Sequence, residues 1–238
     1  MLAESLSPGW VPDGVRIYAI GDSHGCAERL AELHAEIAAH DAASRPVERL
    51  MVVHLGDYVD RGYDSAGVLA LLQDGPAIPG AEVVNLLGNH EQMMLAAMDP
   101  RAEEEVVRFW LDNGGAETLE SYGADPHDMR SWAAVPRRDL DLIARMPAAL
   151  PIGGYFLTHA GVRPGIPFAQ QDPMDLAWIR EPFLSWRGRL EAVVVHGHTP
   201  SEGPEVLEHR IGIDTGAVFG GPLTCAVLDE DRIGFLFT

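Results

Sequence analysis

The chain has 238 residues, of which 47% are hydrophobic and 22% charged, and its net charge is −19. This composition is that of an ordinary globular protein and excludes a disordered chain, while the acidic balance disfavours a nucleic-acid partner, because nucleic-acid binding needs a basic surface. Two cysteines, no signal-peptide pattern in the first residues and no apolar run of membrane length predict a cytoplasmic protein without a membrane partner.

The first half of the chain predicts three strands, each followed by a helix. Short runs rich in apolar and β-branched residues predict strands at 15–20, 50–55 and 82–87, and each run stops at Gly-Asp or Gly-Asn. Helices are expected at about 27–40, where apolar residues recur at helical spacing, at about 65–72, and from about His90 onward. This alternation indicates βαβ units with right-handed connections.

The rest of the chain changes from predicted helices to predicted strands. Residues 99–147 are expected to be mainly helical, with prolines as breaks. Five strands are expected after them, at 155–158, 192–195, 210–213, 223–228 and 233–237. Strand–helix alternation followed by a strand-rich half predicts an α/β fold in which two packed mixed sheets are flanked by helices.

We expect one domain over residues 1–238. Two parts of it stand apart as a cap-like region of helices and loops, around 99–150 and 163–188. The second of these is rich in Pro and Trp and is expected to be a long surface excursion. Structureless loops of that length are usually functional, so both parts are expected to shape a substrate groove.

Five clusters of metal-ligand residue types stand where predicted strands end. They are GDSHG at 21–25, GDYVDRG at 56–62, GNHE at 88–91, THAG at 158–161 and HGHT at 196–199. The carboxyl ends of strands are where open α/β sheets bind ligands. Oxygen and imidazole ligands without thiolates suit Mn, Fe or Zn. Metal ions would also give this acidic protein the positive site that an anionic substrate needs.

Each cluster has a structural explanation when it is taken alone. Asp22 could cap the following helix, and Asn89 could be a turn residue. His159 alone is more often a hydrogen-bonded structural histidine than a ligand. Of His196 and His198, which lie on one side of a strand, one could be structural. Turn chemistry does not readily explain five strand ends that all offer ligands, so the conjunction favours a metal centre.

Taken together, GDSHG, GDYVDRG, GNHE and the later single histidines resemble the calcineurin-like metallophosphoesterases. Within that superfamily they resemble the phosphoprotein phosphatase branch, in particular the bacterial and phage serine/threonine protein phosphatases. The three multi-residue motifs occur in the family's order and spacing, and looser similarity extends over nearly the whole chain. The resemblance implies an αββα sandwich that binds two divalent metal ions, with Mn expected first and Fe or Zn as alternatives.

The resemblance also implies a ligand set in which two ions share one carboxylate. The first ion would be bound by Asp22 and His24, the second by Asn89, His159 and His198, and both by Asp57. His198 matches the family's last ligand, whereas His196 falls outside that position and would lie behind the ligands.

Further residues match the family's catalytic groups. Arg61 and Asn89 would both bind phosphate oxygens, Arg61 because a guanidinium fork suits an oxyanion. His90 would protonate the leaving alkoxide, and Asp60 would hold its imidazole in the needed tautomer. Arg180 would be a second phosphate-binding arginine, with a surface salt bridge as the alternative.

The implied activity is hydrolysis of phosphomonoesters by water held between the two ions, with in-line attack on phosphorus. Phosphoserine and phosphothreonine proteins are the preferred substrates, and small phosphoesters are a further possibility. Symmetrical diadenosine tetraphosphate hydrolases usually carry Val-Ala-Arg-Gly and Gly-Asn-His-Asp, where this chain has Asp60 and Glu91. A phosphodiesterase fits Asp60 and Arg61 less well. A non-catalytic binding module would normally have lost a ligand or the acid.

Overall fold

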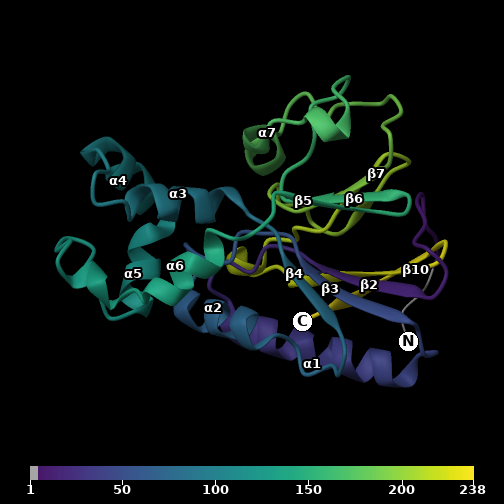
Figure 1. The fold of residues 1–238 in the computed structure, drawn as a ribbon, viewed down its shortest axis with the longest axis horizontal. Coiled ribbons are helices and arrows are strands. Elements are labelled where there is room, and N and C mark those ends of the chain that lie inside the picture. Colours follow the sequence, from purple (N-terminus) through teal and green to yellow (C-terminus); the bar gives the residue numbers. More distant parts are fainter. Residues whose placement is uncertain (1–4) are drawn as a thin grey trace.

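Two β-sheets lie face to face in the computed structural model, which describes residues 5–238 (Figure 1). The first sheet has the order β1-β11-β10-β2-β3-β4, and the second has the order β5-β6-β7-β9-β8. Helices α1 and α2 lie along the outer side of the first sheet, and α7 lies over the second (Figure 1). The predicted α/β class with two mixed sheets flanked by helices is confirmed.

The first sheet consists of β1 (Ser5–Leu6), β2 (Val15–Ile20), β3 (Arg49–His54), β4 (Glu82–Asn85), β10 (Thr224–Asp229) and β11 (Arg232–Phe237). The second consists of β5 (Ala149–Ile152), β6 (Tyr155–Thr158), β7 (Val193–His196), β8 (Glu205–Val206) and β9 (Arg210–Gly212). The α-helices are α1 (Ala27–Ala43), α2 (Ser65–Asp74), α3 (Asn89–Ala97), α4 (Glu104–Trp110), α5 (Ala116–Ser121), α6 (Arg137–Ile143) and α7 (Pro173–Trp178). A kinked segment, η1 (Leu111–Gly115), joins α4 to α5, and short 3-10 turns are η2 (Ser131–Ala134), η3 (Phe168–Gln170) and η4 (Ala217–Phe219).

The central strand β2 shows why the chain forms layers. All six of its residues are buried, and they alternate between two cores. Ile17 and Ala19 belong to the core between the sheets, whereas Tyr18 and Ile20 pack in the core that includes the apolar face of α1. Because successive side chains of a strand point to opposite faces, an apolar strand of this kind must be covered on both sides.

The last two strands return to the first sheet. β10 pairs antiparallel with β2, and β11 pairs with β10, so the second sheet is built from the segment between β5 and β9. Three strands were not predicted: the two-residue edge strands β1 and β8, and β5. Strand β5 contains Pro151 and lies at the edge of the second sheet, where the missing backbone N–H is tolerated.

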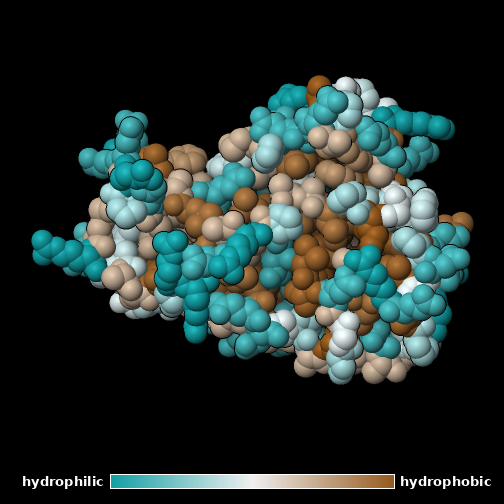
Figure 2. Space-filling model, viewed as in Figure 1, coloured by the Kyte–Doolittle hydropathy of each residue, from teal (hydrophilic) through white to brown (hydrophobic). Residues whose placement is uncertain are grey.

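Helices α3 to α6 lie together beside one end of the sheets (Figure 1). In the segment 99–147, which was predicted to be mainly helical, α4, α5 and α6 together with η1 and η2 account for somewhat more than half of the residues. The segment 163–188 contains η3 and α7, and its Ile179 and Phe183 pack with Val194 of the second sheet. On the face in Figure 2, hydrophilic residues cover the projecting ends of the molecule and apolar residues gather between them. No helix in the range 5–238 has the length and apolar character needed to cross a bilayer.

Candidate active site

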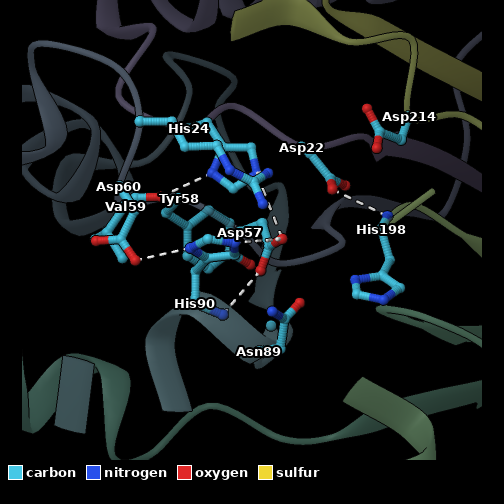
Figure 3. A network of polar contacts seen from close by, with 12 residues as sticks. Asp22, His24, Asp57, Tyr58, Val59, Asp60, Asn89, His90, His198 and Asp214 are labelled. Atoms are coloured by element: carbon cyan, nitrogen blue, oxygen red, sulfur yellow. Dashed lines mark hydrogen bonds and ion pairs between the residues drawn. The ribbon is translucent and has the colours of Figure 1, made fainter. Parts of the chain in front are cut away.

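The polar clusters meet at one edge of the two sheets, where parallel strands end. Strands β2, β3 and β4 are parallel neighbours in the first sheet, and β6, β7 and β9 are parallel neighbours in the second. The loops after them therefore converge from both sheets, and Figure 3 shows their side chains gathered around Asp57. Gly56 allows this convergence, because its φ is +113° and a Cβ there would lie 2.7 Å from His159 Nδ1.

One group of ligand atoms surrounds a carboxylate oxygen of Asp57. His159 Nε2 lies 3.2 Å from Asp57 Oδ1, 3.0 Å from Asn89 Oδ1 and 3.2 Å from His198 Nδ1. The other nitrogen of His159 donates to the Leu55 carbonyl at 3.0 Å, which directs Nε2 into the group. Ligands bound to one ion at about 2.1 Å lie roughly 3 Å apart, so these four atoms fit a single divalent ion. This position favours a ligand role for Asn89 over that of a turn residue, and a ligand role for His159 over that of a structural histidine.

A second group lies on the other side of Asp57. His24 Nε2 is 3.4 Å from Asp57 Oδ2, and His24 Nδ1 donates to the Val59 carbonyl at 2.8 Å. His90 Nε2 lies 4.0 Å from the same carboxylate oxygen. Geometrically, Asp57 is therefore shared by His24 and His90 on one side and by His159 and His198 on the other.

Asp22 is a buried carboxylate at the back of the site. Its Oδ2 accepts from the His198 amide at 2.9 Å, and within residues 5–238 its buried Oδ1 has no hydrogen-bond partner. Asp22 does not cap the following helix, because α1 begins at Ala27 with Cys26 at the N-cap. The free oxygen is what a ligand to the first ion would offer, and His198 Nε2 is a further buried atom without a partner in the same range.

The electrostatics of the cluster also fit cations. Burial lowers the pKa of His24 and of His198 to about 3, so both imidazoles are neutral and can act as ligands. Burial by itself would raise the pKa of Asp57, but the surrounding imidazoles, His159 first, hold it well below its ordinary value. Burial and the charge of Asp214 raise the pKa of Asp22 well above its ordinary value. Divalent ions would stabilise both carboxylates in their charged form.

The predicted acid and its partner are in contact. His90 Nδ1 donates to Asp60 Oδ2 at 2.7 Å, which leaves Nε2 facing Asp57 and the site (Figure 3). The backbone N–H of His90 also donates to Asp57 Oδ1 at 3.1 Å. Burial lowers the pKa of His90 to about 4, while Asp57 opposes that shift. A phosphate dianion bound beside Nε2 would favour the protonated imidazole further.

Both predicted phosphate-binding arginines reach the site. Arg61 Nη1 lies 2.7 Å from His24 Nε2, and its guanidinium stands over the ring of Phe219 at 5.8 Å. Arg180 is exposed, and its Nη2 lies 3.5 Å from the His198 carbonyl. Across residues 5–238 no carboxylate lies within ion-pair distance of Arg180, which disfavours the surface salt bridge. His196 instead turns toward Phe183 and Arg210, behind the ligands.

Sequence reasoning missed the roles of two acidic residues. Glu91 Oε2 accepts from the amides of Asp57 and Gly88, and its Oε1 accepts from those of Tyr58 and Val59. The sequence places Glu91 in the GNHE cluster and distinguishes two branches of the family by it, but does not predict these contacts. Asp214 follows β9 at the same sheet edge and lies beside Asp22 (Figure 3). Its position after a predicted strand was the signal that could have identified it.

The backbone of the site is strained. Positive φ angles occur at His24 (38°), Asp57 (54°), Asp60 (72°), Arg61 (69°) and His198 (66°). Residues with side chains rarely adopt this conformation, and it persists where the surrounding structure enforces it, often at functional sites.

Comparisons with known proteins agree with this geometry. The chain is 32% identical over 218 residues to serine/threonine-protein phosphatase 1 of Salmonella typhimurium, with 88% of this chain and 90% of that protein covered. It is 26% identical over 235 residues to the asymmetrical bis(5'-nucleosyl)-tetraphosphatase PrpE of Bacillus thuringiensis, with 86% and 87% covered. The crystal structure of a candidate diadenosine tetraphosphatase matches the fold with a TM-score of 0.65 and 23% identity over 93% of each chain.

The family itself follows from a match over almost the full length. The model of the calcineurin-like phosphoesterases covers residues 15–236. That range contains all five clusters, both sheets except β1, and the helices between them. The chain therefore belongs to the calcineurin-like phosphoesterase family.

Proposed function

We propose that this protein is a dinuclear-metal phosphomonoesterase that acts on phosphoserine and phosphothreonine in proteins. The observation that carries the proposal is the shared position of Asp57. Its two oxygens face separate groups of ligand atoms, and the His90–Asp60 pair and Arg61 lie beside them. Charge neutralisation, water activation and a proton donor are what hydrolysis of a phosphate monoester needs.

Each ligand has a place in this proposal. Asp22, His24 and Asp57 would hold the first ion, and Asp57, Asn89, His159 and His198 the second. Because the donors are carboxylate, amide and imidazole without thiolate, Mn²⁺ suits the site, with Fe and Zn as alternatives. When bound, the two ions supply Lewis acidity and lower the pKa of a nucleophilic water.

The chain's own residues then handle the phosphate and the proton. Arg61 and Arg180 bind phosphate oxygens together with the Asn89 amide and hold the ester in line with the attacking water. His90 gives its Nε2 proton to the leaving oxygen. Asp60 keeps the imidazole oriented through Nδ1 and stabilises its protonated form.

A protein substrate is supported by an apolar groove of about 420 Å³ beside the site. Its walls come from α3 and from the two segments that were expected to be cap-like, with Phe109 on α4 and Met174 and Trp178 on α7. Trp178 donates to Gln92, three residues after Asn89, so the groove and the site share α3. Apolar side chains next to a phosphoserine would fill such a groove.

A dinucleotide tetraphosphate is the second candidate, because the relative from Bacillus thuringiensis acts on such a substrate by name. The leaving group distinguishes the two. A serine alkoxide needs a proton from an acid such as His90, whereas a nucleotide leaves with less assistance.

The experiment compares kcat/KM for a phosphoserine peptide with apolar flanking residues and for diadenosine tetraphosphate, with Mn²⁺ present. We expect the peptide to be hydrolysed at least about tenfold more efficiently. A preference of similar size for the dinucleotide would replace the first candidate by the second. Absence of both activities, with two ions bound, would favour a small phosphoester or a non-catalytic role.

A further inference from the structure

One segment, Trp110–Thr118, approaches the Asp60 carboxylate. Trp110 Nε1 donates to Asp60 Oδ1 at 3.0 Å and lies 3.1 Å from Oδ2. The Thr118 hydroxyl donates to Oδ1 at 2.7 Å and accepts from the Asp60 amide at 2.8 Å. All three residues have 0% exposure. Together with His90, these donors surround a carboxylate that no water can reach.

The backbone of the same segment is shaped for this approach. The chain kinks at η1 (Leu111–Gly115), where Gly114 has a non-helical φ of +108°, and the Gly114 carbonyl accepts from the Arg61 amide at 3.2 Å. A Cβ at Gly114 would overlap the backbone nitrogen of Arg61, and one at Gly115 would overlap the Trp110 ring. Glycine adopts this positive φ readily, and the kink brings the segment against both Asp60 and Arg61.

We propose that Trp110 and Thr118 are positioning residues for the acid step. They hold the plane of the Asp60 carboxylate, so that Oδ2 remains directed at His90 Nδ1 and Nε2 remains directed at the leaving oxygen. The proposal rests on the proposed function, in which His90 donates that proton. Burial raises the pKa of Asp60 and the two donors oppose this shift, which is consistent with their supporting its charged form.

A purely structural role is the competing explanation, because the Trp110 ring also packs edge-on against Trp132 at 5.8 Å. The two explanations differ in which substrates suffer. Loss of packing would slow all substrates together or unfold the protein. Loss of Asp60 orientation would slow substrates that need a proton and spare those with a good leaving group.

The test uses Thr118→Val, which is nearly isosteric but lacks the hydroxyl, and Thr118→Ser, which retains it. Trp110→Phe removes the indole N–H as a second, independent loss. Glu117→Gln, exposed on the same segment, is the matched control. Each Mn²⁺-loaded variant is assayed on a phosphoserine peptide and on p-nitrophenyl phosphate.

We expect Thr118→Val and Trp110→Phe to lower kcat for the peptide by about 10- to 100-fold, with less than about a threefold change for p-nitrophenyl phosphate and for either KM. Thr118→Ser should restore kcat for the peptide. In the metal-free protein, NMR should detect the His90 Nδ1 proton in the wild type, and its signal should shift in both damaged variants.

Equal losses on both substrates with an unchanged His90 signal would overturn the positioning role. His90→Asn separates this failure from failure of the proposed function. If His90→Asn slows both substrates equally, His90 is not the acid and the proposed function is wrong at that step. If it slows the peptide selectively while Thr118→Val and Trp110→Phe do not, only the positioning role is wrong.

Discussion

Two pairs of buried histidines in this protein have similar geometry and different surroundings. In the active site, His159 Nε2 lies 3.2 Å from His198 Nδ1. Between α1 and β3, His34 Nε2 lies 2.9 Å from His54 Nε2. Burial lowers the pKa of His34 to about 4 and that of His54 to about 3, so both are neutral, and one ring donates to the other.

The difference lies in the groups around each pair. Asp57 and Asn89 direct oxygens at His159, which makes an arrangement of oxygen and nitrogen atoms that suits a cation. The His34–His54 pair adjoins the apolar core beneath the first sheet, near Leu30 and Leu33 of α1. Two close imidazoles are therefore not a metal site in themselves. The carboxylate at the strand end is what would make one of the pairs a ligand set.

The largest expected effect is that of Asp57→Asn, which should make the active-site pair behave like the core pair. Without the shared carboxylate, the ligand groups lose their common negative charge. We expect kcat/KM for p-nitrophenyl phosphate to fall at least about 10³-fold and Mn²⁺ binding by calorimetry to weaken strongly. His34→Gln should leave both values near those of the wild type. Retention of two tightly bound ions by Asp57→Asn would contradict the assignment of Asp57.

His90→Asn tests a different imidazole of the same cluster. Because His90 is proposed to donate a proton, the substitution should slow an alkyl phosphate by about 10²–10⁴-fold and p-nitrophenyl phosphate much less. The comparison is the ratio of kcat values for the two substrates. If the ratio of the two kcat values is the same in His90→Asn and in the wild type, His90 is not the proton donor. It would then act as a metal ligand, which its position beside His24 and Asp57 also allows.

Glu91→Ala tests how the Asp57 loop is supported. Four backbone amides that now donate to a fully buried carboxylate would lose their acceptor. We expect the free energy of unfolding to fall by about 2–4 kcal/mol in urea titrations, with part of the loss recovered by saturating Mn²⁺. A change below about 0.5 kcal/mol, similar to that of the exposed control Glu117→Ala, would show that the loop supports itself.

The smallest effect concerns the core pair and pH. The pKa values of His34 and His54 are lowered in the folded protein, so below about pH 6.5 the unfolded chain binds protons that the folded chain does not. Stability should therefore fall as pH drops from about 6.5 toward 4. His34→Gln removes one such group and should reduce this pH dependence by about 1 kcal/mol per pH unit. If the free energy of unfolding of the wild type and of His34→Gln changes in parallel between pH 7 and 5, His34 does not contribute to the pH dependence of stability.

Most side chains of the site, Arg180 excepted, could be predicted because they belong to short motifs at strand ends. Such motifs carry their own geometry, since parallel strands end at a common edge. Trp110 and Thr118 could not be predicted in the same way. They contact Asp60 across 50 and 58 residues of sequence, and helical periodicity does not indicate which distant polar group a helix residue meets. The contacts of Glu91 likewise depend on the 56–59 loop folding over α3.

The fold was predictable at the level of elements and layers, but strand pairing was not. The pattern of β10 and β11 indicates strands without indicating that they join the first sheet beside β2. Both faces of β10 are apolar and buried, which requires a covered position but does not name the neighbour. Pro151 disfavours a strand at β5 by sequence pattern, and the position of β5 at the edge of the sheet removes the conflict.

Metal dependence is the most direct test of the central claim. The protein is treated with EDTA, and hydrolysis of p-nitrophenyl phosphate is measured while Mn²⁺ is added back and bound metal is counted. The claim predicts no activity without metal and a return of activity that saturates at two ions per chain. Activity that survives complete metal removal, or that stays absent with Mn²⁺, Fe²⁺ and Zn²⁺ alike, would contradict it.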